Sequence, residues 1–172
     1  EVAMVHRDLR QAELAREELR EAMTILEANL PEDDPRRVHL MADYAYILRS
    51  TGDLDESEAL YRETIDRMRQ DPDHYRNSLP AALNNLAYLL RKKEGYEESE
   101  VLYEEAVAGV ESYYGEAHPR TLMYGNNLAV TKELLGKSDE ARELLEGAIP
   151  LNVQLHGEDH WRVGLPWLSL CV

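Results

Sequence analysis

The stretch LNNLAYLLRKKEGYEESEVLYEEAV, at residues 83–107, contains the pattern that decides the fold of this chain. In its first half, apolar side chains recur at the i, i+3, i+4, i+7 spacing of one helix face, at Leu83, Leu86, Ala87 and Leu90. Its second half repeats that spacing with Ser99, Leu102, Tyr103, Ala106 and Val107. Gly95 lies between the halves and predicts a break. The stretch therefore predicts a helical hairpin whose first helix lies near residues 79–93.

The hairpin pattern returns every 42 residues on both sides of this stretch. One column of the repeat is Ala45, Ala87 and Ala129, and others are Ser57, Ser99 and Ala141, or Tyr61, Tyr103 and Leu145. A fixed period of this length is typical of stacked repeat proteins. The columns predict one array over residues 1–172, made of the second half of a repeat at 1–34, whole repeats at 35–76, 77–118 and 119–160, and the start of a truncated repeat at 161–172.

Small residues recur where the two helices of each hairpin are expected to cross, such as Ala87 and Ser99. They allow the two backbones to approach closely, while larger residues fill the remaining space. A single hairpin cannot bury its apolar stripe, so neighbouring hairpins must stack. The predicted fold class is an all-α solenoid.

With these motifs the sequence resembles the tetratricopeptide repeat (TPR) family, in particular its longer, kinesin-light-chain-like variety. The resemblance rests on the segments at residues 84–87, 95–100, 102–106 and 115–119, and on their recurrence at 126–129, 136–141 and 157–160. It implies a right-handed solenoid in which first helices line a concave groove and second helices form the convex back. It also implies a protein-binding module.

Three residues of the third repeat depart from the pattern. Lys132 occupies the column of Leu48 and Leu90, Gly125 replaces a large residue, and Pro150 is expected to interrupt the second helix. The third repeat is therefore predicted to be the most loosely packed.

The composition excludes several classes of protein. The net charge is −15, which disfavours binding to nucleic acid or to anionic membranes, and no apolar run is long enough to span a bilayer. One cysteine, Cys171, cannot form an internal disulfide or a thiolate zinc site. Because the chain begins at Glu1 without a leader, we expect a cytoplasmic piece of a longer protein.

Charge is divided between the two sets of helices. The first helices carry +2, +3 and +1, and the second helices carry −3, −7 and −2. Given the groove that the resemblance implies, this division predicts a partner peptide or protein segment that is acidic.

Helix geometry places a set of side chains opposite the core face, where they are candidates for peptide binding. They are Asp43, Tyr46, Arg49, Asn84, Asn85, Tyr88, Arg91, Lys92, Asn126 and Asn127. Asparagine amides both donate and accept, as a peptide backbone requires, and the family implies this role for Asn85 and Asn127. Other interpretations stay open: the asparagines bond between first helices or face solvent, the tyrosines fill space between helices, and the cations are ordinary surface charges.

Other polar residues have the spacing of metal or catalytic sites, but their positions in the repeat favour structural roles. His156 and His160 have helical metal-ligand spacing, yet Gly157 lies between them in a stretch that repeats the linker at residues 115–118. His118 and His160 share a repeat column, which predicts a structural role at the entry to a first helix. The carboxylate pairs Glu97–Glu98 and Glu104–Glu105 are expected on a solvated outer face, and no phosphate loop or catalytic motif occurs. We expect no enzyme activity, no catalytic residue, no cofactor and no metal.

The sequence thus predicts a non-catalytic protein-interaction module. Two alternatives are a structural spacer or self-association segment of a larger multidomain protein, and an array beside a signalling catalytic domain outside this sequence. The apolar segment at residues 165–172 would have one covering neighbour, so it predicts self-association through the C-terminal end, or else a segment that frays or folds differently.

Overall fold

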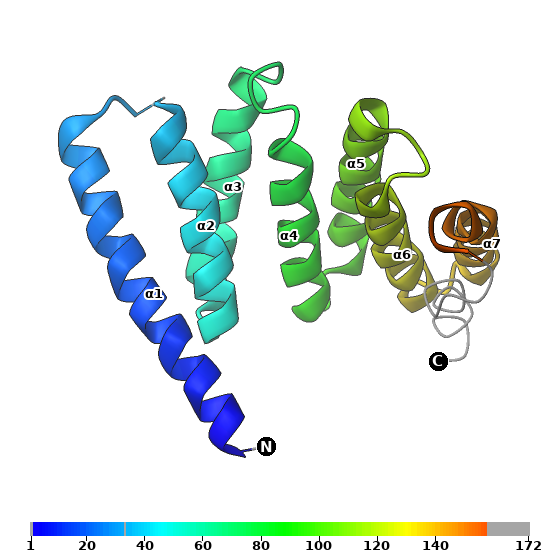
Figure 1. The fold of residues 1–172 in the computed structure, drawn as a ribbon, viewed down its shortest axis with the longest axis horizontal. Coiled ribbons are helices and arrows are strands. Elements are labelled where there is room, and N and C mark those ends of the chain that lie inside the picture. The colour runs from blue at the N-terminus through cyan, green and yellow to red at the C-terminus, as the bar shows by residue number, and fades with distance from the viewer. Residues whose placement is uncertain (1, 33, 158–172) are drawn as a thin grey trace. The chain divides into compact units, whose positions relative to one another are not determined.

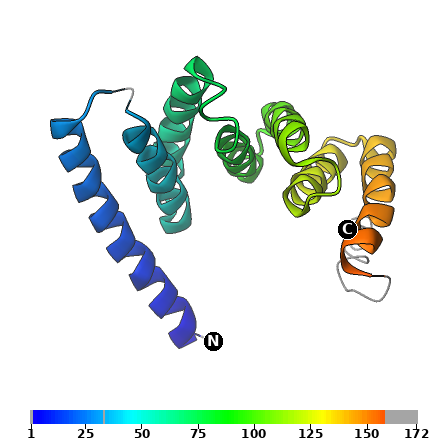
Figure 2. The same ribbon diagram turned by 45° about the horizontal axis from the view of Figure 1, so that its top comes forward.

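The computed structural model describes residues 2–32 and 34–157, and over this part of the chain it contains seven α-helices and no strand. The chain divides into two compact units, at residues 1–75 and 76–172. The first unit holds α1 (Val2–Asn29), α2 (Pro35–Thr51) and α3 (Leu54–Gln70). The second holds α4 (Leu79–Lys92), α5 (Tyr96–Tyr114), α6 (Pro119–Leu134) and α7 (Ser138–His156). Within each unit every helix packs on the next one along the chain (Figures 1 and 2).

The hairpins cross where the sequence has its small residues. Ala45 and Ala87 are fully buried, and their backbone carbonyls accept hydrogen bonds from the hydroxyls of Ser57 (2.7 Å) and Ser99 (2.8 Å). In the hairpin of α6 and α7, two buried alanines meet instead, Ala129 and Ala141. The predicted all-α fold of helical hairpins is confirmed.

Two first helices begin at a proline that follows a capping side chain. Asp34 accepts a hydrogen bond from the backbone N–H of Arg36 at 2.9 Å, just before Pro35. His118 Nδ1 accepts one from the backbone N–H of Arg120 at 3.2 Å, just before Pro119. A proline at the first helical position costs no hydrogen bond, because a backbone N–H at that position would have no partner within the helix. The structural role predicted for His118 at the entry to a first helix is therefore confirmed.

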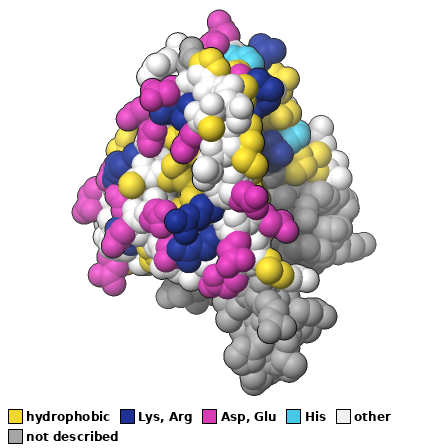
Figure 3. All heavy atoms as spheres, turned by 90° about the vertical axis from the view of Figure 1, so that its left-hand side faces the viewer, with side chains coloured by type: hydrophobic (Ala, Val, Ile, Leu, Met, Phe, Trp, Pro, Cys, Tyr) yellow, Lys and Arg dark blue, Asp and Glu magenta, His cyan; other side chains and the backbone are white. Residues whose placement is uncertain are grey.

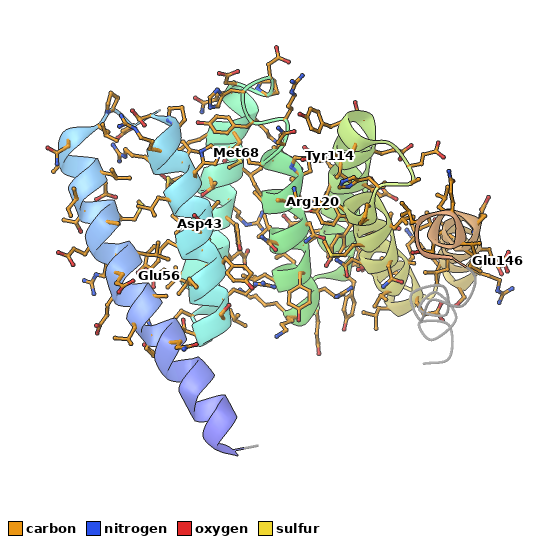
Figure 4. The ribbon with its side chains drawn as sticks, in the orientation of Figure 1. Asp43, Glu56, Met68, Tyr114, Arg120 and Glu146 are labelled. Carbon is orange, nitrogen blue, oxygen red and sulfur yellow. The ribbon has the colours of Figure 1, made fainter. Side chains whose placement is uncertain are left out.

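Pro150 does not interrupt α7, so this sequence-based expectation was wrong. The helix is continuous from Ser138 to His156. An internal proline removes one backbone donor, which would have bonded to the carbonyl four residues earlier, at Glu146 on α7 (Figure 4). Pro150 and Glu146 are both exposed, so water can reach that carbonyl.

The turn between α4 and α5 differs from the sequence-based interpretation. The left-handed residue is Glu94, with φ of 64°, whereas Gly95 has φ of −82°. Gly52 and Gly136 occupy the equivalent positions 42 residues away on either side, with φ of 97° and 75°. Only glycine adopts this conformation without a steric cost.

Replacing Glu94 with glycine is expected to raise the free energy of unfolding by about 1 kcal/mol, because it relieves that steric cost. Chemical denaturation followed by circular dichroism measures the change. Glu97→Gly, an exposed position in the first turn of α5, is the matched control and should destabilise the protein. An unchanged or lower stability of Glu94→Gly would show that the left-handed turn is unstrained.

Candidate functional site

A cluster of two cations and an aromatic ring lies at the C-terminal end of α4. The Arg91 guanidinium and the Lys92 ammonium each lie 5.3 Å from the centre of the Tyr88 ring. Arg91 also lies 5.6 Å from the ring of Tyr103 on α5. Contacts of this length are attractive, because the face of an aromatic ring is negative. The sequence of α4 has no acidic residue, so this end of the helix is positive.

The asparagines of α4 and α6 have two different environments. The side-chain amide of Asn127 donates to the side-chain oxygen of Asn84 at 3.0 Å, and the exposed fraction of Asn84 is only 9%. Arg91 donates to the backbone carbonyl of Asn127 at 3.1 Å, which strengthens the same contact between α4 and α6. Asn84 and Asn127 therefore bond between first helices, one of the alternatives that the sequence left open. Asn85 and Asn126 are half-buried.

The first unit repeats the aromatic–cation pair on α2. The Arg49 guanidinium lies 4.9 Å from the centre of the Tyr46 ring, and these two residues precede Arg91 and Tyr88 by 42 positions. The Tyr46 side chain is exposed, and the exposed Asp43 lies on the same helix (Figure 4). In the third repeat the same positions are Val130 and Glu133, so the pair is confined to two repeats.

A buried ionic cluster joins α5, α6 and α7, and the repeat pattern of the sequence did not predict it. Lys132 is 6% exposed, and its ammonium donates to carboxylates of Glu100 (2.7 Å), Glu104 (3.0 Å) and Glu140 (2.8 Å). Glu100 is 7% exposed and also accepts from the ammonium of Lys137, at 2.6 Å. The signal in the sequence was Lys132 in a leucine column, with glutamates on both neighbouring helices.

The charges of this cluster stabilise one another. Burial acts to raise the pKa of Glu100, but the hydrogen bonds from Lys132 and Lys137 outweigh it and lower this pKa below its ordinary value of 4.5. Burial by itself would lower the pKa of Lys132, but the hydrogen bonds that its ammonium donates to Glu100, Glu140 and Glu104 raise it instead. Both side chains are therefore charged at neutral pH.

The lowered pKa of Glu100 predicts a loss of stability in acid. The folded protein binds fewer protons than the unfolded chain, so this contribution is complete above the ordinary pKa of 4.5 and is lost as the pH falls through the folded value. Thermal denaturation between pH 7 and pH 3 should therefore show a smaller drop in Tm for Glu100→Gln than for the wild type. Equal drops would show that Glu100 does not contribute to acid sensitivity. Glu105→Gln, at an exposed position on α5, is the control.

Exposed aromatic side chains gather where α5 leads into α6. The rings of Tyr113 and Tyr114 meet edge to face at 4.6 Å, and Tyr114 stacks on His118 at 4.3 Å. Arg120, shown with Tyr114 in Figure 4, lies 5.9 Å from the Tyr114 ring. The helical patterns did not predict this group, because it depends on the path of the connecting loop.

The described part of the chain offers no grouping of three His, Cys, Asp or Glu side chains that could hold a metal ion. Glu97 and Glu98 are exposed, as the sequence predicts. The side chain of His156, and His160 with the segment at 161–172, lie outside the described residues. The predictions of self-association or fraying at the C-terminus therefore remain predictions.

The family model "Tetratricopeptide repeat" matches residues 1–70 and 78–161, which is most of the chain. The chain belongs to the tetratricopeptide repeat family. A search of curated proteins found no significant match.

Several solved structures have a similar fold. The TPR-like repeats of a protein described as a kinesin light chain from Podosopora anserina share 21% identity, with a TM-score of 0.85 over 98% of this chain and 80% of that one. BtubC (BKLC) from P. vanneervenii shares 25% identity, with a TM-score of 0.67 over 96% of this chain and 63% of the other. A Rap protein complexed with Competence and Sporulation Factor shares 18% identity, with a TM-score of 0.73 over 98% and 44%.

Membership of the TPR family makes this chain a protein-interaction module of stacked helical hairpins. None of the described helices is both long enough and apolar enough to cross a membrane. Apolar side chains of the TPR unit at residues 1–75 reach its surface, with Leu14 and Ile25 of α1 both exposed. A hollow of about 490 Å³ lies between α1 and α2 and is lined by Ile25, Leu26 and Leu40. Figure 3, viewed from the side of α1, shows acidic, basic and apolar side chains mixed on that face.

Proposed function

We propose that this TPR chain binds an acidic segment of a partner protein through the exposed faces of its first helices. The observation that carries the proposal is the cluster of Arg91 and Lys92 on Tyr88. The aromatic ring holds both cations at one end of α4, so their charge is concentrated before a partner arrives. A carboxylate that approaches this end of the helix meets two donors with little ordering cost.

The distribution of charge supports an acidic partner over a basic one. The second helices are strongly acidic, with a net charge of −7 over residues 94–112 alone. They would repel an acidic segment from their own face and leave α4 as the place where it binds. The pair of Tyr46 and Arg49 on α2 offers a second, smaller positive point in the first unit. The proposal applies to each unit by itself.

Asparagine amides on α4 and α6 extend the proposed site. Asn85 and Asn126 remain candidates to hold the main chain of a partner, because each amide can donate and accept at once. Asn84 and Asn127 have the different role of bonding α4 to α6. A partner segment would therefore contact the half-buried Asn85 and Asn126, together with Tyr88 and Lys92.

Replacing Lys92 with glutamate is expected to slow association with an acidic peptide severalfold at low salt, because charge reversal removes the steering attraction. A fluorescein-labelled Gly-Glu repeat peptide is the probe, and stopped-flow anisotropy measures the rate. Lys92 is the better position for this change than Arg91, because Arg91 also bonds to the backbone of Asn127.

The matched control is Arg142→Glu, which makes the same change of charge on the exposed face of α7 in the same unit. It should leave the rate close to that of the wild type. Equal slowing by both variants would mean that only the net charge matters, and would contradict a site on α4.

Self-association within a larger protein is the second candidate function, and the exposed Leu14 and Ile25 of α1 favour it. Exposed apolar side chains near a hollow tend to meet another surface. Sedimentation equilibrium of the wild type and of an Ile25→Ser variant tests it. A concentration-dependent dimer that the substitution weakens would support it, and a monomer at all concentrations would exclude it.

A further inference from the structure

The third hairpin, formed by α6 and α7, contains a cavity. The other repeats have larger residues at two of the positions that line it. The cavity has a volume of about 920 Å³ and lies among α5, α6 and α7, all within the second unit. Much of its lining is apolar, from Val107, Leu122, Leu128, Leu144, Ala148 and Leu151. Cavities of this size can hold several aliphatic side chains.

The first cause of the cavity is a glycine in a column of large residues. Gly125 lines it, whereas Met41 and Leu83 occupy the equivalent positions and are buried in their hairpins. A Cβ atom added at Gly125 would meet no atom of the described residues within 4 Å. The missing side chain therefore leaves space that no neighbour within residues 34–157 fills.

The second cause is a leucine in a column of tyrosines. Leu145 lines the cavity, and the equivalent Tyr61 and Tyr103 are completely buried. Leucine is shorter than tyrosine, so side chains fill less of the interior of the third hairpin at this second position. Both changes enlarge the same space between α6 and α7.

The rim of this cavity is acidic. Its lining includes five glutamates, at positions 104, 111, 116, 140 and 143, against the two cations Arg120 and Lys132. The Lys132 ammonium already donates to Glu104 and Glu140. The remaining carboxylates, Glu111, Glu116 and Glu143, surround apolar walls and so favour a cationic occupant with apolar side chains.

We propose that this cavity is a second binding site, which takes leucine-like side chains of a basic, amphipathic partner segment whose Lys or Arg residues meet the rim. Its chemistry is the opposite of that of the site proposed for the acidic segment on α4, and Asn126 is the residue that the two proposed sites share. Binding of an amphipathic helix in an apolar groove is a common mode of peptide recognition. On α7, Leu144, Ala148 and Leu151 follow the spacing of one helix face, so this helix forms one wall of the site.

The test uses a fluorescein-labelled helical peptide in which a leucine stripe is flanked by lysines, with a version in which glutamates replace the lysines. The lysine peptide should bind the wild-type chain, and the glutamate peptide should bind at least tenfold more weakly at this site. Gly125→Leu should fill the cavity, raise the Tm and weaken binding of the lysine peptide at least tenfold. Gly125→Ala is the matched control, since it adds helix propensity without filling the space, and it should bind as the wild type does.

A rim variant keeps the test valid if Gly125→Leu does not fold. Glu143→Lys changes an exposed side chain, so the fold should be unaffected while association with the lysine peptide slows severalfold at low salt. Unchanged binding by both Gly125→Leu and Glu143→Lys would overturn the proposal. Lys92→Glu should not weaken this peptide, so failure here is distinguishable from failure of the proposed site on α4.

Either of two other occupants of the cavity would also overturn the proposal. If the chain's own C-terminal segment fills the cavity, Gly125→Leu will shift the emission of the two tryptophans, Trp161 and Trp167, in the absence of peptide. If a second copy fills it, sedimentation equilibrium will show a wild-type dimer that Gly125→Leu dissociates. The proposal expects unchanged emission and an unchanged association state.

Discussion

Replacing Lys132 with methionine is expected to lower the free energy of unfolding by about 3 kcal/mol, the low end of the cost of breaking a buried ion pair. Methionine has a similar length, so packing is nearly preserved and the main loss is electrostatic. Lys132 joins glutamates of α5 and α7, and without it the buried carboxylate of Glu100 and the exposed carboxylates of Glu104 and Glu140 lose a common partner. Lys137 still donates to Glu100, which keeps the expected loss at the low end. Urea denaturation followed by circular dichroism measures it.

Two further variants separate the electrostatic loss from a packing defect. Glu104→Gln removes a partner that is 52% exposed, and it should cost less than about 1 kcal/mol because solvent screens exposed pairs. Adding Glu100→Gln to Lys132→Met should recover part of the loss, because a neutral amide then replaces the buried carboxylate that has lost Lys132 and keeps only Lys137. A double variant as unstable as the sum of the single variants would indicate lost packing instead. A Lys132→Met variant with wild-type stability would show that the cluster contributes nothing to folding.

The repeat columns predicted the helices because burial imposes the same pattern on every hairpin. Ala87 and Ser99 are buried at the crossing of α4 and α5, where the sequence placed them. Local chemistry was harder to predict where one residue departs from its column. Glu94 carries the left-handed turn that a glycine carries in the repeats on either side, and Lys132 occupies a leucine column without facing an apolar core.

The environment of Lys132 could not be predicted from its own helix. Its carboxylate partners lie 32 and 28 residues before it and 8 residues after it, on two other helices. The repeat columns relate equivalent positions of successive hairpins, whereas this cluster is made of non-equivalent positions that helix packing brings together. For the same reason Glu104 was expected to face only solvent, although it accepts from Lys132 at 3.0 Å.

The clustering of part of the predicted binding set followed from helix geometry, and its role in binding stays a prediction. Tyr88, Arg91 and Lys92 were expected on one face of α4, and the structure brings these three side chains together. Asn84 was expected on the same face, but a helix in an array has a side facing the next first helix as well as a solvent side. Its amide lies on that side and bonds to Asn127 of α6.

Replacing Ala87 with leucine is expected to lower the free energy of unfolding by about 1 to 3 kcal/mol, the usual cost of overpacking a close crossing. Ala87 has no exposed surface, and its carbonyl accepts a hydrogen bond of 2.8 Å from the hydroxyl of Ser99 on the partner helix. Three additional carbons at this point must push α4 and α5 apart, which also lengthens that hydrogen bond. Ala108→Leu makes the same change at an exposed position of α5, and its Tm should stay close to that of the wild type. If Ala87→Leu melts at the wild-type temperature, the small-residue column is not a requirement of the crossing, and the hairpin tolerates a wider separation than its alanines and serines indicate.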